Sequence, residues 1–174
     1  SLSFSSSTIN GTQDNHIAIL ASSDFNGNYE DINSIKQANW VDITSHFELG
    51  TNATFVASNS KDISDLMVKG KPLYVAIKYT NKPQLENGLS RTWMFQDFQL
   101  TSNAVISGSK PVIADQTKLA FQIIDPYKEV APARSLITGT RITLLGNVYK
   151  DPNDPIYDPE NPIYDPENPI YDPE

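Results

Sequence analysis

Residues 73–80 read LYVAIKYT, and five of these eight side chains are β-branched or aromatic. Such a composition is typical of a β-strand, and we expect this segment to be a central strand of a sheet. Further strands are expected at residues 2–7, 16–22, 54–58, 91–101, 104–106, 119–124 and 141–148, with a short one near Trp40. Loops rich in Asn, Asp, Gly and Ser separate them, which is typical of an all-β sandwich.

The segment RTWMFQDFQLT, residues 91–101, carries an irregular pattern of aromatic side chains. In a regular strand, side chains two residues apart share a face, so Trp93 and Phe95 lie on one face and Phe98 on the other. Such a change of parity predicts a β-bulge near Gln96 and Asp97, or burial of both faces of the strand.

Helical signals are few in this chain. Residues 32–38 predict one or two helical turns, because Ile32 and Ile35 are three positions apart. Asn10 and Gly11 form a dipeptide that is typical of tight turns. We therefore expect an antiparallel β-sandwich that forms one domain over residues 1–150, which is long enough to bury a core.

The charge of the chain is concentrated at its C-terminal end. The chain has 13 basic and 21 acidic residues, and residues 151–174 contain eight of the acidic ones and none of the basic ones. Residues 1–150 therefore carry thirteen of each sign and are formally neutral. Without an excess of basic residues, the sequence gives little support to nucleic-acid binding.

The chain contains no cysteine, which excludes disulfides, thiolate zinc sites and a cysteine nucleophile. Its first residues, SLSFSSST, include neither a charged segment nor a long apolar run, so we expect no signal peptide and no membrane span within the chain. Because the sequence opens on a predicted strand without Met, we expect a fragment or a mature piece of a longer protein.

Residues 151–174 form an acidic, proline-rich heptad-repeat segment that we interpret as a linker or an insertion. Proline recurs at alternating spacings of four and three residues, which excludes a coiled coil and favours extended pieces joined by turns. An Ile-Tyr pair recurs in each repeat, and Tyr157, Tyr164 and Tyr171 are therefore candidate contacts to a partner. A semi-rigid acidic spacer is the alternative.

Four segments of the body carry a family resemblance. They are residues 22–27 (SSDFNG), 40–44 (WVDIT), 70–79 (GKPLYVAIKY) and 92–98 (TWMFQDF). In this order and spacing, within residues 2–101, they resemble a β-sandwich family of cell-surface lipoproteins from anaerobic gut bacteria. That family is similar to the cleaved-adhesin and choice-of-anchor jelly rolls, which are galactose-binding-like, and its members also carry repeated Tyr-Asp-Pro-Glu insertions.

The resemblance implies a jelly-roll fold, export, and attachment at the cell surface as an outer-membrane lipoprotein, or a periplasmic location. It implies no known activity. Many cleaved-adhesin relatives carry an Asp three residues after the Trp, in a region where some bind a structural calcium ion. Here that position is Gln96, and the acidic residue is displaced to Asp97. This departure argues against an inherited calcium site.

A second calcium candidate is a loop in which Asp24, Asn26 and Asn28 alternate around Gly27. Oxygen ligands at such spacing faintly resemble a calcium loop, but the position that would complete a twelve-residue EF-hand is Ile35. The alternative is a turn in which these side chains bond to their own backbone, which we favour. We expect no cofactor, and calcium remains the only metal candidate.

Glycan binding is the leading hypothesis for the body. Jelly rolls often present aromatic side chains that stack on sugar rings, with polar side chains beside them. Tyr29, Trp40, Tyr79 and Arg91 are the candidate ligand-binding residues, whereas Trp93 in the middle of a strand is better explained as core. The polar loop at residues 81–91 suits ligand contact but does not require it.

Catalytic signals are weak. The sequence has no Gly-x-Ser-x-Gly motif, its acidic residues are scattered, and its two histidines, His16 and His46, have no evident partner set. We therefore expect a non-catalytic binding module at the cell surface or in the periplasm, which captures glycans or proteins as part of an anchored lipoprotein. The alternatives are a structural or adhesive domain and a hydrolase.

Overall fold

The computed structural model describes residues 1–14, 16–82, 84–104, 108–125 and 135–146. Its strands are β1 (Leu2–Ile9), β2 (Ile17–Ser22), β3 (Val41–Asp42), β4 (Val56–Ala57), β5 (Tyr74–Tyr79), β6 (Thr92–Thr101), β7 (Val112–Asp115), β8 (Leu136–Ile137) and β9 (Ile142–Leu144). Its helices are α1 (Ile32–Gln37), α2 (Gln84–Asn87) and the 3₁₀ turns η1 (Thr44–His46) and η2 (Ser64–Leu66). The protein is mostly β, as expected.

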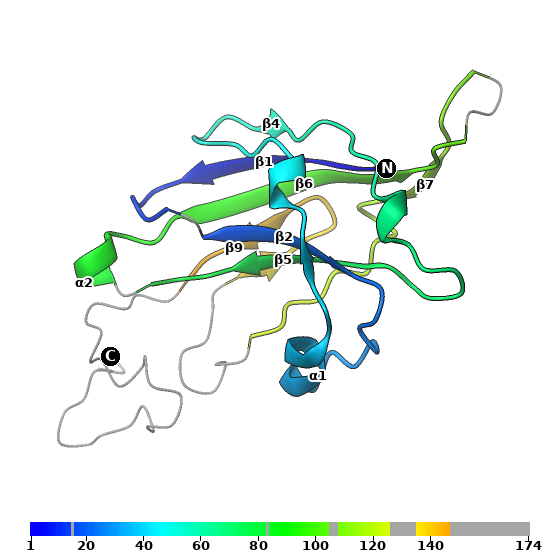
Figure 1. The fold of residues 1–174 in the computed structure, drawn as a ribbon. Coiled ribbons are helices and arrows are strands. Elements are labelled where there is room, and N and C mark those ends of the chain that lie inside the picture. Colours follow the sequence, from blue (N-terminus) through cyan, green and yellow to red (C-terminus); the bar gives the residue numbers. More distant parts are fainter. Residues whose placement is uncertain (15, 83, 105–107, 126–134, 147–174) are drawn as a thin grey trace.

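The strands form two antiparallel sheets (Figure 1). The larger sheet has the order β4-β1-β6-β9-β8, and β7 also pairs with β6. The smaller sheet has the order β3-β2-β5. This arrangement confirms the all-β antiparallel prediction and is consistent with a β-sandwich. The jelly-roll connectivity and the boundary at residue 150 remain predictions.

The position of β5 corrects one prediction. Among the described strands, β5 pairs only with β2 and lies at the edge of the smaller sheet rather than at its centre. Its composition has another cause, because Val75, Ile77 and Tyr79 pack against the hydrophobic core. Burial of one face selects β-branched and aromatic side chains in an edge strand as it does in a central one.

The bulge predicted near Asp97 is present. Ser3 pairs with Gln99 and Ser5 pairs with Gln96, so two residues of β6 lie opposite one residue of β1. Asp97 has a φ of 58°, in the left-handed region. Because of the extra residue, the aromatic side chains before and after the bulge point to the same face of the sheet. They pack in one core.

The core lies between the two sheets. Phe4 on β1 is 2% exposed, and its ring centroid lies 5.0 Å from that of Phe47, 5.7 Å from that of Phe95 and 5.2 Å from that of Phe98. Ile19 on β2 is fully buried in the same cluster. Side chains from both sheets therefore share one hydrophobic cluster, as in a sandwich.

Outside the main strands, some predictions are confirmed and others are wrong. The predicted helical turns at residues 32–38 correspond to α1, whose N-cap residue Asp31 accepts a hydrogen bond from the backbone N–H of Asn33 at 2.9 Å. No strand forms at residues 119–124. Leu119 and Phe121 pack on the core from a loop, with the ring centroid of Phe121 4.8 Å from that of Phe98. Ile123 and Ile124 are exposed. The sequence pattern did not predict β7, β8 or α2.

Some predictions lie outside the described residues. These are the repeat segment 151–174 with Tyr157, Tyr164 and Tyr171, and most of the expected strand at residues 104–106. In the part of the chain that the structure describes, no helix has both the length and the apolar character needed to cross a membrane.

Candidate functional site

The candidate ligand-binding residues form two groups at opposite ends of β5. Tyr74, the first residue of the strand, contacts the ring of Tyr29 directly. Tyr74 and Trp40 both pack against the ring of Phe25. At the other end, the backbone carbonyl of Arg91 accepts a hydrogen bond from the hydroxyl of Tyr79, the last residue of the strand. Five residue steps of a β-strand separate the two ends by roughly 17 Å.

The first group is an aromatic patch made of Phe25, Tyr29, Trp40 and Tyr74. Phe25 is 4% exposed and lies at its centre, with ring centroids 5.3 Å from Tyr29, 5.8 Å from Trp40 and 5.0 Å from Tyr74. The outer three rings are only partly buried. The patch therefore leaves three rings partly exposed around a buried fourth.

Short-range hydrogen bonds fix the loop that carries Phe25. The hydroxyl of Ser22 donates to Asp24 Oδ1 at 2.7 Å and accepts the backbone N–H of Phe25 at 3.2 Å. Asp24 Oδ1 also accepts the backbone N–H of Asn39 at 2.9 Å, which connects the beginning and the end of the segment between β2 and β3. The hydrogen bond from Ser22 is the main cause that lowers the pKa of Asp24, so this carboxylate is charged beside the patch at neutral pH.

Gly27 is required for the packing of Tyr74. It has a φ of 80°, and a Cβ at this position would lie 2.9 Å from the hydroxyl oxygen of Tyr74. Only glycine combines this backbone conformation with this close approach. The Asp-Phe-x-Gly run of the sequence therefore places Phe25 under the patch and leaves room for Tyr74.

Trp40 is hydrogen-bonded to the backbone of α1. Its indole N–H donates to the backbone carbonyl of Ile35 at 2.8 Å, a residue inside the helix. Asn26 reaches the same helix through a hydrogen bond from its amide nitrogen to the hydroxyl of Ser34 at 3.2 Å. Since the indole N–H is already satisfied, Trp40 offers a ligand its ring rather than a hydrogen bond.

The three candidate calcium ligands form turns with their own backbone. Asn26 Oδ1 accepts the N–H of Asn28 at 2.9 Å, and Asn28 Oδ1 accepts the N–H of Glu30 at 3.2 Å. Asp24 Oδ1 has the two donors described above. Among the described residues, no group of three or more His, Cys, Asp or Glu side chains is placed to hold a metal ion. Calcium binding at this loop remains an untested alternative.

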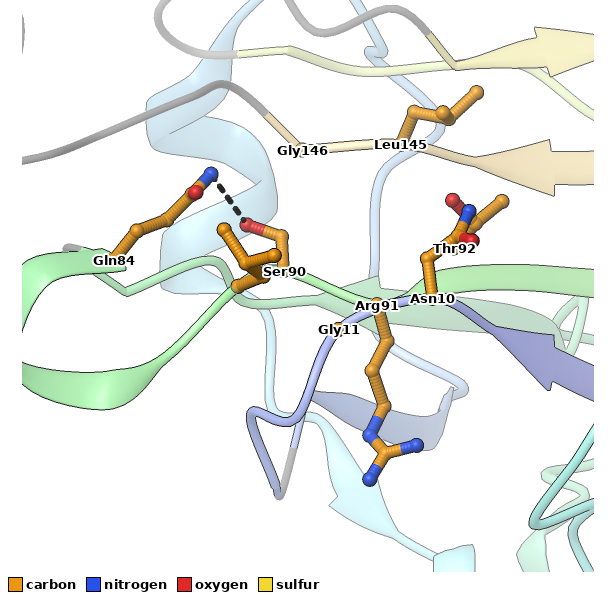
Figure 2. Close-up of a pocket in the computed structure, with 9 residues that line it drawn as sticks. Asn10, Gly11, Gln84, Ser90, Arg91, Thr92, Leu145 and Gly146 are labelled. Atoms are coloured by element: carbon orange, nitrogen blue, oxygen red, sulfur yellow. Dashed lines mark hydrogen bonds between the residues drawn. The ribbon is translucent and has the colours of Figure 1, made fainter.

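The second group borders a cavity of about 220 Å³ between the beginning of β6 and the end of β9 (Figure 2). Its walls carry the side chains Asn10, Gln84, Leu89, Ser90 and Thr92, and Gln84 Nε2 donates to the hydroxyl of Ser90 at 3.3 Å. The hydroxyl of Ser90 also donates to Asn81. We call this cavity the end pocket.

Tyr79 is hydrogen-bonded to the backbone of a residue that lines the end pocket. Its hydroxyl donates to the backbone carbonyl of Arg91 at 2.9 Å. Burial raises the pKa of Tyr79 to about 12, although hydrogen bonds with the backbone of Gly146 and the side chain of Ser90 act in the opposite direction. The phenol is therefore neutral at any physiological pH, and its hydrogen bonds join β5, β6 and the end of β9.

The guanidinium of Arg91 points away from the end pocket (Figure 2). Its Nε donates to the backbone carbonyl of Gln13 at 2.7 Å, and its Nη2 lies 3.7 Å from the exposed carboxylate of Asp14. Gln13 is fully buried, and its amide nitrogen donates to the carbonyls of Lys82 and Gly88 at 2.8 and 2.7 Å. Arg91 and Gln13 therefore hold in place the loop between β1 and β2, which connects the two sheets.

The two histidines lie in different environments. His16 is 2% exposed, its ring packs edge-on against Tyr79, and neither of its nitrogens has a hydrogen-bond partner in the described structure. Burial, and then the charges of Arg91 and Lys82, lower the pKa of His16. His46 is exposed. Among the described residues, neither nitrogen of His16 is hydrogen-bonded to a nucleophile, the contact through which a general base acts.

Sequence reasoning missed three residues that organise these groups: Phe25, Tyr74 and Gln13. Phe25 and Tyr74 belong to the quoted segments at residues 22–27 and 70–79, so their position in a resemblance motif was an available signal. Gln13 carried none, because a glutamine in a turn-rich loop is usually exposed.

The model of a family described as a domain of unknown function, DUF5017, matches residues 1–121. These residues contain the aromatic patch and most of the end pocket. No curated protein and no solved structure matches the chain.

Proposed function

The chain belongs to the DUF5017 family, a domain of unknown function, and we propose that it is a non-catalytic module that captures glycans on its aromatic patch. One observation carries this proposal. Three partly exposed rings, Tyr29, Trp40 and Tyr74, surround the buried Phe25 at centroid distances of 5.0 to 5.8 Å.

The patch has the chemistry that a sugar ring needs. Tyr and Trp present a flat apolar surface at a low cost in side-chain entropy, and they combine it with a polar edge. The apolar C–H face of a pyranose packs on such a surface, while its hydroxyls need polar partners around it. Asp24, Asn26 and Asn28 are exposed beside the rings and supply acceptors and donors of this kind.

The rigidity of the loop supports binding rather than catalysis. Hydrogen bonds donated by Ser22 and Asn39, and one accepted by Ser34, hold the residues around the patch before any ligand arrives. A preorganised surface binds with a smaller entropic cost. The carboxylate of Asp24, the residue before Phe25 in the chain, has a lowered pKa, which makes it a poor general acid near neutral pH.

The cellular setting is part of the same proposal. The resemblance to surface lipoproteins of gut anaerobes supports an exported protein with a galactose-binding-like jelly roll, attached at the outer membrane or facing the periplasm. A glycan-capturing module suits such a location. Protein capture, a purely structural or adhesive role, and hydrolysis are the competing functions, and the tail tyrosines 157, 164 and 171 are the candidate contacts for a protein partner.

A glycan array followed by calorimetry tests the proposal. The full chain is expected to bind at least one neutral polysaccharide, and Tyr29→Ala and Tyr74→Ala are each expected to weaken that binding at least tenfold, since aromatic anchors dominate such surfaces. Leu89→Ala serves as a matched control, because Leu89 is a 62% exposed apolar side chain at the end pocket.

Two results would reject glycan capture at the patch. One is the absence of binding to every polysaccharide on the array. The other is binding that Leu89→Ala abolishes and Tyr74→Ala leaves unchanged, which would move the site to the end pocket. Turnover of a bound glycan that is lost in His16→Gln would support the hydrolase alternative instead.

A further inference from the structure

The strands at the edges of the two sheets differ in length. The strands β3, β4 and β8, which end the described sheets elsewhere, have two residues each. Such short edge strands offer few backbone groups to an incoming segment and so prevent unwanted pairing. β5 is the longest of the described edge strands. It has six residues, contains no proline and no bulge, and pairs only with β2 among the described strands (Figure 1).

The register of β5 shows which of its backbone groups face away from β2. Thr80, the residue after the strand, donates its N–H to the carbonyl of His16 at 2.7 Å. Hydrogen-bonded pairs alternate along an antiparallel ladder, so the residues that bond to β2 are Lys78 and every second residue before it. The N–H and C=O groups that face the free edge belong to Val75, Ile77 and Tyr79. Among the described residues, no hydrogen bond involves these groups.

The contacts of β2 give the same assignment from the other side. Ile19 stands opposite Ile77 in the register. Its carbonyl accepts the N–H of Ile43 at 2.9 Å, and its own N–H donates to Thr44 Oγ1 at 2.8 Å. The backbone groups of Ile19 are therefore directed to the far side of β2, and those of Ile77 to the free edge. An extended segment beside β5 would pair with these groups, as in β-strand addition.

Each repeat of the C-terminal segment is suited to pair on one side only. The segment lies outside the described residues, and its sequence contains the run Pro-Ile-Tyr-Asp-Pro at residues 155–159, 162–166 and 169–173. The two prolines of a run are four positions apart, so in an extended strand both lack an N–H on the same side. The N–H groups of the Ile and the Asp are on the opposite side. A run laid with that side toward β5 would keep its ladder hydrogen bonds and leave the prolines on the outer edge.

The C-terminal segment starts from one end of this edge. Gly146, the last described residue, hydrogen-bonds through its backbone to the side chain of Tyr79, which ends β5. Eight residues lead from Gly146 to Asp154, the residue before the first run, and they span up to roughly 26 Å. Since β5 is roughly 17 Å long, the first run can reach any position along the edge. A segment that follows β5 from this end runs antiparallel to it, as β2 does on the other side.

The charges of the edge and of the repeats are complementary. Residues 66–85, which are β5 and its flanking segments, contain four lysines and no acidic residue. Three of these lysines, Lys71, Lys78 and Lys82, are exposed. Residues 151–174 contain eight acidic residues and no basic one. A repeat beside β5 therefore brings carboxylates close to lysines, and this attraction favours it over a neutral or basic segment.

We propose that the free edge of β5 docks the chain's own C-terminal repeats, with one Pro-Ile-Tyr-Asp-Pro run added as an antiparallel strand. The prolines then close the smaller sheet against further pairing, as the short strands do at the other edges. Because three runs on the same chain are tethered close to this edge, the effective concentration of the docking segment is high. Docking at β5 is independent of glycan capture, since it uses backbone groups of β5 and not the rings of the aromatic patch.

Amide hydrogen exchange of the full ¹⁵N-labelled chain, followed by NMR, tests the proposal. The amides of Val75, Ile77 and Tyr79, which we call the edge amides, are expected to be protected because a docked run accepts their hydrogen bonds. The amides of Ala76 and Lys78 face β2 and serve as an internal reference for the fold.

Two sets of proline substitutions, placed on opposite sides of the runs, identify the docked side. The test set removes the N–H of the Ile in every run: Ile156→Pro, Ile163→Pro and Ile170→Pro. The control set places the same number of prolines on the outer side: Tyr157→Pro, Tyr164→Pro and Tyr171→Pro. The test set is expected to accelerate exchange of the edge amides about tenfold or more, and the control set no more than about threefold. Neither set should change exchange at Ala76 and Lys78.

Loss of edge protection in the test set alone supports the docked repeat. Free exchange of the edge amides in the wild type, or equal effects of the two sets, would overturn the proposal. Protection that rises with protein concentration would also overturn it, because a second copy would then supply the strand. The glycan array reports on the aromatic patch, so a failure of glycan capture leaves these outcomes unchanged.

Discussion

Phe95 and Phe98 pack in the same core with their ring centroids 6.4 Å apart, although they are three positions apart on one strand. A regular strand would direct them to opposite faces. Asp97, at a φ of 58°, adds the extra residue that turns Phe98 back toward Phe95. The core of this domain therefore depends on the backbone conformation of one exposed acidic residue.

The effect of a substitution at Asp97 on stability is expected to depend on how readily the new residue adopts the left-handed backbone conformation. Asp97→Val places a β-branched residue in the left-handed region and should lower the free energy of unfolding by about 1–3 kcal/mol. Asp97→Gly and Asp97→Asn adopt this conformation readily and should stay within about 1 kcal/mol of the wild type. Urea denaturation measures all three, and equal stability of the Val and Gly variants would contradict the assigned bulge.

Truncation of Phe95 is expected to be severe, because its side chain is fully buried between the sheets. Phe95→Ala should lower the free energy of unfolding by about 3–5 kcal/mol through lost burial and the cavity left behind. Val112→Ala is the control: Val112 is 53% exposed, so the change should cost no more than about 0.5 kcal/mol. Similar losses in thermal or urea unfolding would show that the core is elsewhere.

His16 is expected to make stability fall in mild acid. Burial lowers the pKa of His16 in the folded state below its ordinary value of 6.5, so the unfolded state takes up a proton first. Stability is therefore greatest above pH 6.5 and declines as the pH falls below that value. His16→Leu should flatten this decline in urea denaturation measured at several pH values.

His46 provides the matched control for this experiment. Its side chain is exposed, so His46→Gln should retain the wild-type dependence of stability on pH. If His16→Leu shows the same decline as the wild type, the acid sensitivity arises from other groups.

Asp62 is expected to contribute to acid resistance near the N-terminal strand. Its Oδ1 accepts the hydroxyl of Ser64 at 2.7 Å and the amide of Asn103 at 2.7 Å, and these bonds contribute to lowering the pKa of Asp62 from 3.8 to about 2. The contribution of Asp62 is therefore present above pH 3.8 and is lost as the pH falls toward 2.

Asp62→Ala should lower the melting temperature at pH 5 and should bring the variant closer to the wild type as the pH approaches 2. Asp65→Ala, three residues along the chain, is the control, and its melting temperature should follow that of the wild type. A constant difference between Asp62→Ala and the wild type at every pH would disprove the assigned interaction.

Removal of calcium is expected to have no effect. The oxygens of Asp24, Asn26 and Asn28 already accept hydrogen bonds within their loop, so the turn does not need a cation to satisfy them. The melting temperature should be the same in chelator and in excess calcium. A lower value in chelator that calcium restores, and that Asp24→Ala abolishes, would establish the calcium alternative.

Local patterns in the sequence predicted several features correctly. The parity change between Phe95 and Phe98 located the bulge, and Asn10 and Gly11 adopt the positive φ values, 59° and 57°, that their turn chemistry indicated. The pattern failed at residues 119–124, where Leu119 and Phe121 pack on the core from a loop without forming a strand. Ile123 and Ile124 of the same segment are exposed. Periodicity reports burial, and burial does not require a strand.

The sequence by itself determined the all-β class, the bulge, the turns and the neutral charge of the body, because steric limits on φ and ψ and the two-residue period of a strand act over a few neighbouring residues. Only the tertiary structure placed β5 at a sheet edge and assembled Tyr29, Trp40 and Tyr74 around Phe25. These arrangements join residues that are far apart in the chain, and which strands meet is decided by the packing of the whole core.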